Sequence, residues 1–152
     1  GSRQWSELRL FRMNRLCEEA YTQGGLLSGV DLSLMLNLSD TAIAAQLATW
    51  EKETDIVIPR RATVHDMGSG VTHKRIICRK RHLEGKAPNV VARETYHTLE
   101  SVDHYLGQYD RVRHCRAEGM NSQKTAHILG CSERLVREYL EIDDQINEAR
   151  QL

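Results

Sequence analysis

The fold of this 152-residue chain is decided by residues 122–141, SQKTAHILGCSERLVREYLE. A helix-turn-helix unit needs a small residue where its helices cross, a turn residue that tolerates a left-handed backbone, and an N-cap for the second helix. Ala126, Gly130 and Ser132 occupy these three positions. The apolar residues that would hold the two helices together are Leu129, Cys131, Val136 and Tyr139. The segment therefore predicts two helices that cross steeply, so that the second can enter the major groove of DNA.

The outward face of this second helix carries side chains that can read DNA. Ser132, Arg134 and Arg137 fall on it, and arginine can bind the major-groove edge of guanine through two hydrogen bonds. We therefore predict that these three residues contact bases, with phosphate contact as the alternative for the two arginines. The acidic residues on the same face are Glu133, Glu138 and Glu141.

A second predicted helix pair spans residues 29–48. Ser33 is its small crossing residue, Asn37 its turn residue and Ser39 its N-cap. The residues of its smooth outward face are Asp40, Thr41, Ala44, Ala45 and Ala48. Such a face can contact thymine methyl groups or pack against another helix, and the sequence favours neither alternative over the other. In the first alternative, Thr41 contacts a base.

A third predicted pair, residues 88–107, follows from an internal repeat. Leu83-Glu84-Gly85 corresponds to Ala117-Glu118-Gly119, an offset of 117 − 83 = 34 residues. Tyr96 stands at the turn, where glycine would fit better. The residues of the outward face are Glu100, Asp103 and His104. Since carboxylates and phosphates repel each other, we expect this pair to be scaffold or a protein-contact surface.

Residues 55–72 differ from the helical remainder of the chain. Ile56-Val57-Ile58 and Ala62-Thr63-Val64 lie on either side of Pro59, and the turn-forming residues 66–70 follow. Short runs of β-branched residues bounded by turn residues are typical of strands. We therefore predict a short β-hairpin, the wing of a winged helix-turn-helix unit, in preference to a linker loop.

The formal net charge is zero, but the charges are segregated along the chain. Lys/Arg and Asp/Glu number 5 and 8 in residues 1–58 (5 − 8 = −3), 12 and 6 in residues 59–116 (12 − 6 = +6), and 4 and 7 in residues 117–152 (4 − 7 = −3). A basic centre favours contact with a polyanion, although a charge run can also be a solvated face. The predicted phosphate contacts, on the wing and on a helix that begins near residue 72, are Arg60, Arg61, Lys74, Arg75, Arg79, Lys80 and Arg81.

Composition disfavours several classes of protein. Cysteines 17, 78, 115 and 131 lack CxxC spacing, which predicts reduced thiols in the cytoplasm and no metal site. No apolar run reaches the length of a membrane span, and no signal-peptide pattern occurs. Acids do not cluster and histidines lack triad spacing, so we expect no catalytic residue, no cofactor and no small-molecule substrate. A nucleophilic role for Tyr105 or Tyr139 is the remaining enzymatic alternative.

The fold class that follows is all-α, mainly helical, with tandem helix-turn-helix units and one wing-like hairpin. Trp5, Leu8 and Phe11 recur at helical spacing, so a helix of about five turns is expected before Gly24. This helix packs on the next unit or, as the alternative, forms a homodimer contact. We predict two domains, residues 3–72 with the hairpin and residues 73–152 with two helix pairs that share one long helix.

Several motifs resemble those of an uncharacterised, mainly prokaryotic family catalogued as a domain of unknown function, some of whose members are labelled transposase-like. The motifs that carry the likeness are Thr72-His73-Lys74, Leu83-Glu84-Gly85, Ala92-Arg93-Glu94-Thr95, Tyr96-His97-Thr98, Val102-Asp103-His104-Tyr105 and Asp110-Arg111-Val112. The likeness extends over residues 24–140. It implies tandem helix-turn-helix architecture and a regulatory or mobile-element setting, and it supplies no site residues.

Together these features predict a non-enzymatic protein that binds double-stranded DNA, as a transcription regulator or as the targeting module of a mobile element. The alternative is a helical adaptor whose helix-turn-helix units have become protein-contact surfaces. The acidic and alanine-rich outward faces of two of the three pairs favour that alternative.

Overall fold

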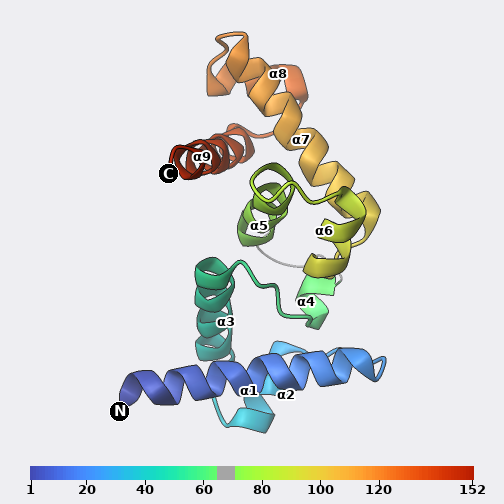
Figure 1. The fold of residues 1–152 in the computed structure, drawn as a ribbon, viewed down its shortest axis with the longest axis vertical. Coiled ribbons are helices and arrows are strands. Elements are labelled where there is room, and N and C mark those ends of the chain that lie inside the picture. Colours follow the sequence, from blue (N-terminus) through green and yellow to red (C-terminus); the bar gives the residue numbers. More distant parts are fainter. Residues whose placement is uncertain (65–70) are drawn as a thin grey trace. The chain divides into compact units, whose positions relative to one another are not determined.

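The computed structural model describes residues 1–64 and 71–152, and in these two ranges the chain is helical without a strand. In chain order the helices of these ranges are α1 (Ser2–Thr22), α2 (Gly29–Leu36), α3 (Asp40–Thr54), α4 (Arg61–Val64), α5 (Val71–His82), α6 (Pro88–Thr95), α7 (Leu99–Ala117), α8 (Ser122–Leu129) and α9 (Glu133–Arg150) (Figure 1). The chain divides into two compact units. The first unit comprises Gly1–Thr72 with Glu94–His97, and the second comprises His73–Arg93 with Thr98–Leu152.

The predicted wing-like β-hairpin over residues 55–72 is wrong. Residues 56–60 have no regular structure, and residues 61–64 form the short helix α4; the expected turn, residues 66–70, lies outside the described residues. The β-branched run is explained by burial, since Val57 and Ile58 are 2% and 0% exposed. The backbone amide of Ile58 donates a hydrogen bond to the Glu51 carboxylate and not to a neighbouring strand. The linker alternative therefore describes residues 56–60 better.

The core of the first unit forms between α1, α2 and α3. Its buried residues are Met13, Cys17, Leu32, Ile43, Leu47 and Ile58. The helix predicted before Gly24 is confirmed as α1. Its buried side, however, carries Met13 and Cys17, whereas Trp5 and Phe11 are exposed. The side of α1 that packs on the unit therefore does not include these two aromatic residues.

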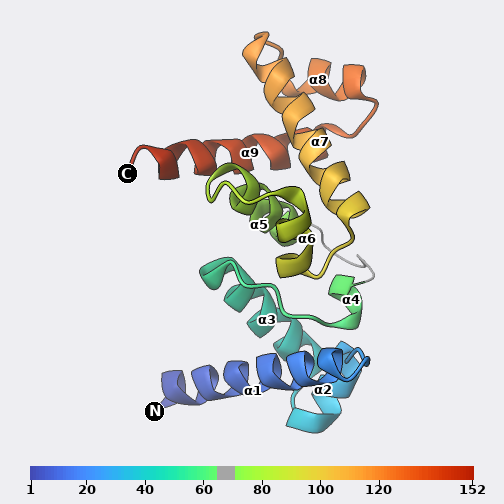
Figure 2. The same ribbon diagram turned by 45° about the vertical axis from the view of Figure 1, so that its right-hand side comes forward.

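The core of the second unit gathers residues from all five of its helices. Its fully or nearly fully buried residues include Ile77 and Cys78 from α5, Val91 and Ala92 from α6, Tyr109 and Val112 from α7, Ala126 from α8, and Val136, Tyr139 and Ile146 from α9. Ile76 and Ile77 of α5 are fully buried, so the basic side chains of this helix surround an apolar inner side. In both ribbon views α9 crosses α7 at a steep angle (Figures 1 and 2).

Three helix pairs share one turn geometry. The pairs are α2–α3, α6–α7 and α8–α9, and each begins with a helix of eight residues. A left-handed residue follows that helix, with φ of 54° at Asn37, 56° at Tyr96 and 65° at Gly130. Two residues further on, the N-caps of the long helices are Ser39, Thr98 and Ser132. The three predicted turn residues and the two predicted N-caps, Ser39 and Ser132, are thus confirmed, and the structure adds Thr98 as the N-cap of α7.

Candidate nucleic-acid interface

The turn between α8 and α9 is fixed by backbone and capping hydrogen bonds. The amide of Cys131 donates to the Ala126 carbonyl at 3.1 Å, which closes the end of α8. The hydroxyl of Ser132 accepts from the Leu135 amide at 3.2 Å and so caps α9. Val136 and Tyr139 are fully buried on the inner side of α9. The opposite side of its first turns therefore faces solvent.

The two predicted base-reading arginines lie on that outward side. The side chains of Arg134 and Arg137 are 87% and 70% exposed. Arg134 Nε lies 3.2 Å from a Glu138 carboxylate oxygen, and one Arg137 Nη lies 2.6 Å from Glu133 Oε1. Ser132, the third predicted contact, is exposed as well, and its capping bond leaves its hydroxyl proton free to donate. The structure thus brings the three residues together at the start of α9.

Both carboxylates beside these arginines also accept a hydrogen bond from another helix. Glu133 Oε1 accepts from the Ser122 hydroxyl of α8 at 2.7 Å. The pKa of Glu133 is lowered by this bond first and by the bond from Arg137 second. Glu138 accepts from Lys74 Nζ of α5 at 2.9 Å. Arg134 and Arg137 are therefore each paired with a carboxylate that has a second donor.

Five of the seven predicted phosphate contacts are partly or largely buried. Arg60 and Arg61 belong to the first unit, and the other five belong to the second. The side chain of Arg60 is 16% exposed and lies 3.6 Å from Glu51, while that of Lys74 is 12% exposed and paired with Glu138. The three half-buried residues of the set, each of which has a partner, are Arg75, Arg79 and Lys80. The exposed ones are Arg61 and Arg81.

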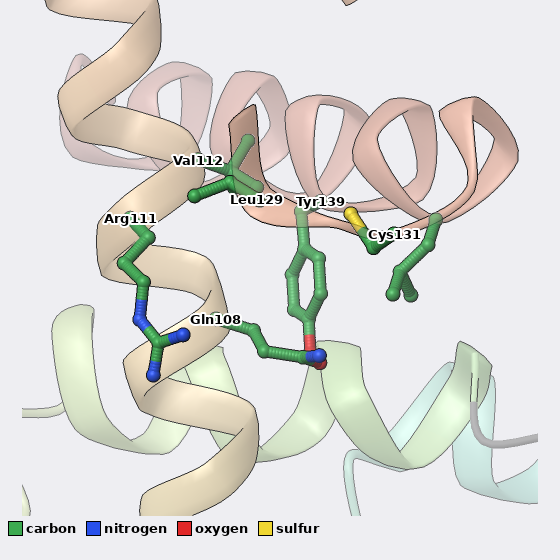
Figure 3. Close-up of a pocket in the computed structure, with 7 residues that line it drawn as sticks. Gln108, Arg111, Val112, Leu129, Cys131 and Tyr139 are labelled. Carbon is green, nitrogen blue, oxygen red and sulfur yellow. The ribbon is translucent and has the colours of Figure 1, made fainter. Parts of the chain in front are cut away.

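Two exposed cations near the start of α9 were not among the predicted contacts. Arg111 lines a small pocket with Cys131 and Leu135, so it lies beside the turn that leads into α9 (Figure 3). Lys124 lies in the first turn of α8. Neither side chain has a hydrogen bond or ion pair within residues 1–64 and 71–152. Two other arginines of α7, Arg113 and Arg116, instead bind the carboxylate of Asp143.

The three long helices present different chemistry at equivalent outward positions. Counting from each N-cap, the second and fifth residues are Thr41 and Ala44 in α3, Glu100 and Asp103 in α7, and Arg134 and Arg137 in α9. All six side chains belong to exposed residues. Of the three faces, that of α9 is therefore the one with cations where a groove-binding helix would meet bases.

The described ranges contain no cluster of three or more residues able to hold a metal ion. In the same ranges, no helix is both long and apolar enough to pass through a bilayer. The cysteines are free thiols, three of them buried, and burial raises the pKa of Cys17 to about 11. A buried thiol with a raised pKa is a poor nucleophile at neutral pH.

The fold and the α9 face define an all-helical protein with three equivalent helix pairs and a cationic face at the start of the last one. The chain belongs to a family described as proteins of unknown function, DUF1670, whose model matches residues 2–142. Membership of an uncharacterised domain family, which the sequence motifs predicted, is thereby confirmed. No curated protein and no solved structure matches the chain.

Proposed function

We propose that the protein binds double-stranded DNA through the α8–α9 pair, with the first turns of α9 in the major groove and without catalysis. The observation that supports this most is the pair of exposed arginines, Arg134 and Arg137, two and five residues after the N-cap Ser132. Residues at the start of the second helix are the ones that contact base edges in helix-turn-helix complexes. A regulatory or mobile-element setting in a prokaryotic cytoplasm is the context we propose for this activity.

The glutamates beside the arginines do not prevent DNA contact. An exposed ion pair between residues i and i+4 contributes only about 0.3–0.5 kcal/mol. A bidentate arginine–guanine contact contributes roughly 1–3 kcal/mol of discrimination. Because a guanidinium carries five N–H donors, Arg134 and Arg137 can contact a guanine edge while they remain bonded to their carboxylates.

Phosphate contact in this proposal comes from cations that flank the start of α9. Arg111 lies beside the α8–α9 turn, and Lys124 lies in the first turn of α8, where the positive end of the helix dipole also favours an anion. Arg81, at the exposed end of α5, is a further candidate. Lys74 and Arg60 are removed from the set of contacts because their charges are already paired below the surface.

Selection from random duplex DNA, followed by binding measurements on the selected site, tests the proposal. We expect Arg134→Ala and Arg137→Ala each to relax preference at one base position by about 1–3 kcal/mol. Arg3→Ala is the matched control, because Arg3 also forms an exposed i,i+4 pair with a glutamate, on α1. If neither variant differs from Arg3→Ala in base preference, the assigned interface is wrong.

A second candidate function is protein contact, and α1 favours a second copy of this chain as the partner. Trp5, Leu8 and Phe11 are 66%, 42% and 61% exposed on one helix, and clustered exposed apolar residues mark interaction surfaces. Leu8 lies three residues from each aromatic residue, so an antiparallel copy of α1 sets Leu8 against Leu8 and Trp5 near Phe11. A two-fold contact needs this self-complementarity.

Light scattering during size-exclusion chromatography over a range of concentrations tests this contact. We expect the parent chain to dimerise and a Trp5→Ser/Phe11→Ser variant to remain monomeric. Val30→Ser/Leu34→Ser is the control, since it removes two apolar residues of α2 that are equally exposed. A monomeric parent, or equal loss of dimer in both double variants, contradicts the α1 contact.

A further inference from the structure

We infer that Glu133 and Glu138 are positioning residues that hold Arg137 and Arg134 in the conformations that read bases. The inference rests on the proposed DNA binding by α9 and concerns how that helix achieves its specificity. It assigns roles to two glutamates that would otherwise only weaken attraction to DNA, and to the two residues, Ser122 and Lys74, that hold them.

The first set joins α8 to α9. Glu133 Oε1 accepts one hydrogen bond from the Ser122 hydroxyl at 2.7 Å and one from Arg137 at 2.6 Å. Ser122 is the first residue of α8, whose own N-cap is Asn121. The hydroxyl of Ser122 is therefore not used for capping, and its bond fixes the carboxylate that Arg137 contacts.

The second set joins α5 to α9. Lys74 Nζ lies 2.9 Å from one carboxylate oxygen of Glu138, and Arg134 Nε lies 3.2 Å from the other. The Lys74 ammonium also lies 5.8 Å from the centre of the Tyr139 ring, and Tyr139 is fully buried. The carboxylate of Glu138 is thus held from the core side while it contacts the arginine on the solvent side.

The two i,i+4 arginine–glutamate pairs of α1 lack such a second donor within the described residues. Arg3–Glu7 and Arg15–Glu19 are also i,i+4 pairs, at 3.5 and 2.7 Å, and their glutamates are 66% and 53% exposed. Within the described residues, the carboxylates of Glu7 and Glu19 have no donor other than their arginines. Glu133 and Glu138 are less exposed, at 41% and 17%, because each is bonded to another helix. The second donor, Ser122 for Glu133 and Lys74 for Glu138, therefore distinguishes the pairs of α9 from ordinary surface ion pairs.

A supported carboxylate reduces the conformational freedom that a long side chain must lose when it binds. Arginine carries many rotamers in solution, and its guanidinium reads guanine only in one planar orientation. Functional side chains are held in place by second-layer hydrogen bonds in precise binding sites. Loss of the support should therefore lower base preference more than it lowers general affinity for DNA.

Three variants distinguish the positioning of Arg137 by Glu133 from the effect of the negative charge of Glu133 on DNA binding. Ser122→Ala removes the support of Glu133 and leaves every charge in place; Glu133→Gln removes the charge and keeps an oxygen that can accept from Ser122 and Arg137. Glu141→Gln is the matched control, because Glu141 is exposed on α9 and accepts a hydrogen bond from Gln145, not from an arginine. Binding of each variant to the selected site and to an unrelated duplex is measured at several salt concentrations, with thermal unfolding as a check of folding.

For Ser122→Ala we expect preference at the base position read by Arg137 to fall by roughly threefold to tenfold, with affinity for the unrelated duplex unchanged. Glu133→Gln should show a smaller loss of preference, since the amide oxygen of glutamine accepts weaker hydrogen bonds from Ser122 and Arg137. It should also bind the unrelated duplex more tightly, since one negative charge is gone. Glu141→Gln should bind both duplexes more tightly with its preference intact. Unchanged preference in both Ser122→Ala and Glu133→Gln overturns the positioning role while DNA binding stands. Failure of the parent to bind any duplex overturns both the proposed function and this inference.

Discussion

At the scale of single residues, the turn that orients α9 depends on Gly130, and a substitution there tests this dependence. Its φ of 65° lies in the left-handed region, and a Cβ added there would meet no heavy atom within 4 Å. The cost of Gly130→Ala is therefore conformational, about 1–2 kcal/mol, and urea unfolding should show that loss. Gly107→Ala, inside α7, is the control; its Cβ would make an ordinary 3.6 Å contact, and it should stabilise the protein by about 0.5–1 kcal/mol. Equal stability of Gly130→Ala and the parent contradicts this account.

His82 makes the stability of the second unit depend on pH. Burial lowers the pKa of His82 below its usual 6.5; the Asp110 carboxylate opposes the shift, and nearby arginines, Arg113 first, add to it. The unfolded chain therefore takes up a proton near pH 6.5 that the folded state resists. The free energy of unfolding should fall as the pH drops from 7.5 through 6.5 toward 5.5. His82→Gln should reduce that fall, and a pH profile identical to that of the parent would contradict the prediction.

At the scale of elements, one carboxylate holds α7 to α9. Asp143 accepts a hydrogen bond from Tyr109 at 2.9 Å and one from Arg116 at 3.0 Å, and it is 5% exposed. Asp143→Asn removes the charge at nearly constant volume and leaves the tyrosine and arginine poorly paired. We expect a loss of about 2–3 kcal/mol in denaturant unfolding. Asp144→Asn is the control, because Asp144 is half exposed and its pair with Arg116 should contribute less than about 1 kcal/mol.

The turns of the three helix pairs could be predicted from sequence because each depends on a few adjacent residues. A left-handed turn residue followed by a serine or threonine cap is a local requirement, met even at Tyr96. That tyrosine is tolerated in the turn partly through its edge-on contact with Tyr21, at 5.0 Å between ring centres. A contact between residues so far apart in the chain has no sequence signal.

The irregular conformation of residues 56–60 and the burial of several basic side chains could not be predicted, because both depend on tertiary packing. A run such as Ile56-Val57-Ile58 is apolar enough for a strand or for a buried irregular segment, and only packing decides between them. Lys74 looked like part of an exposed charge run, but Glu138, distant in sequence, pairs with it. The sequence signal for Arg111 and Lys124 is their position near the predicted helix pair of residues 122–141. The prediction relied instead on the density of basic residues in residues 74–81.

At the scale of the whole molecule, the salt dependence of binding reports how many phosphates the protein contacts. Each phosphate contact contributes about 0.9 to the slope of log K against log salt. We expect Arg111→Gln/Lys124→Gln to flatten the slope by about 1.8 while base preference stays the same. The control is Arg3→Gln/Arg12→Gln, which removes two exposed arginines from α1. An unchanged slope in the Arg111/Lys124 variant would show that phosphates are bound elsewhere.

The assignment of Glu94–His97 to the first unit has a practical consequence for anyone dissecting this protein. A fragment that ends at Thr72 loses the segment that contains Tyr96 and so leaves the ring of Tyr21 bare. Deletion mapping across that boundary would therefore report damage to a hydrophobic contact as though it were loss of activity. Point substitutions in the intact chain are the sound way to assign roles to either unit.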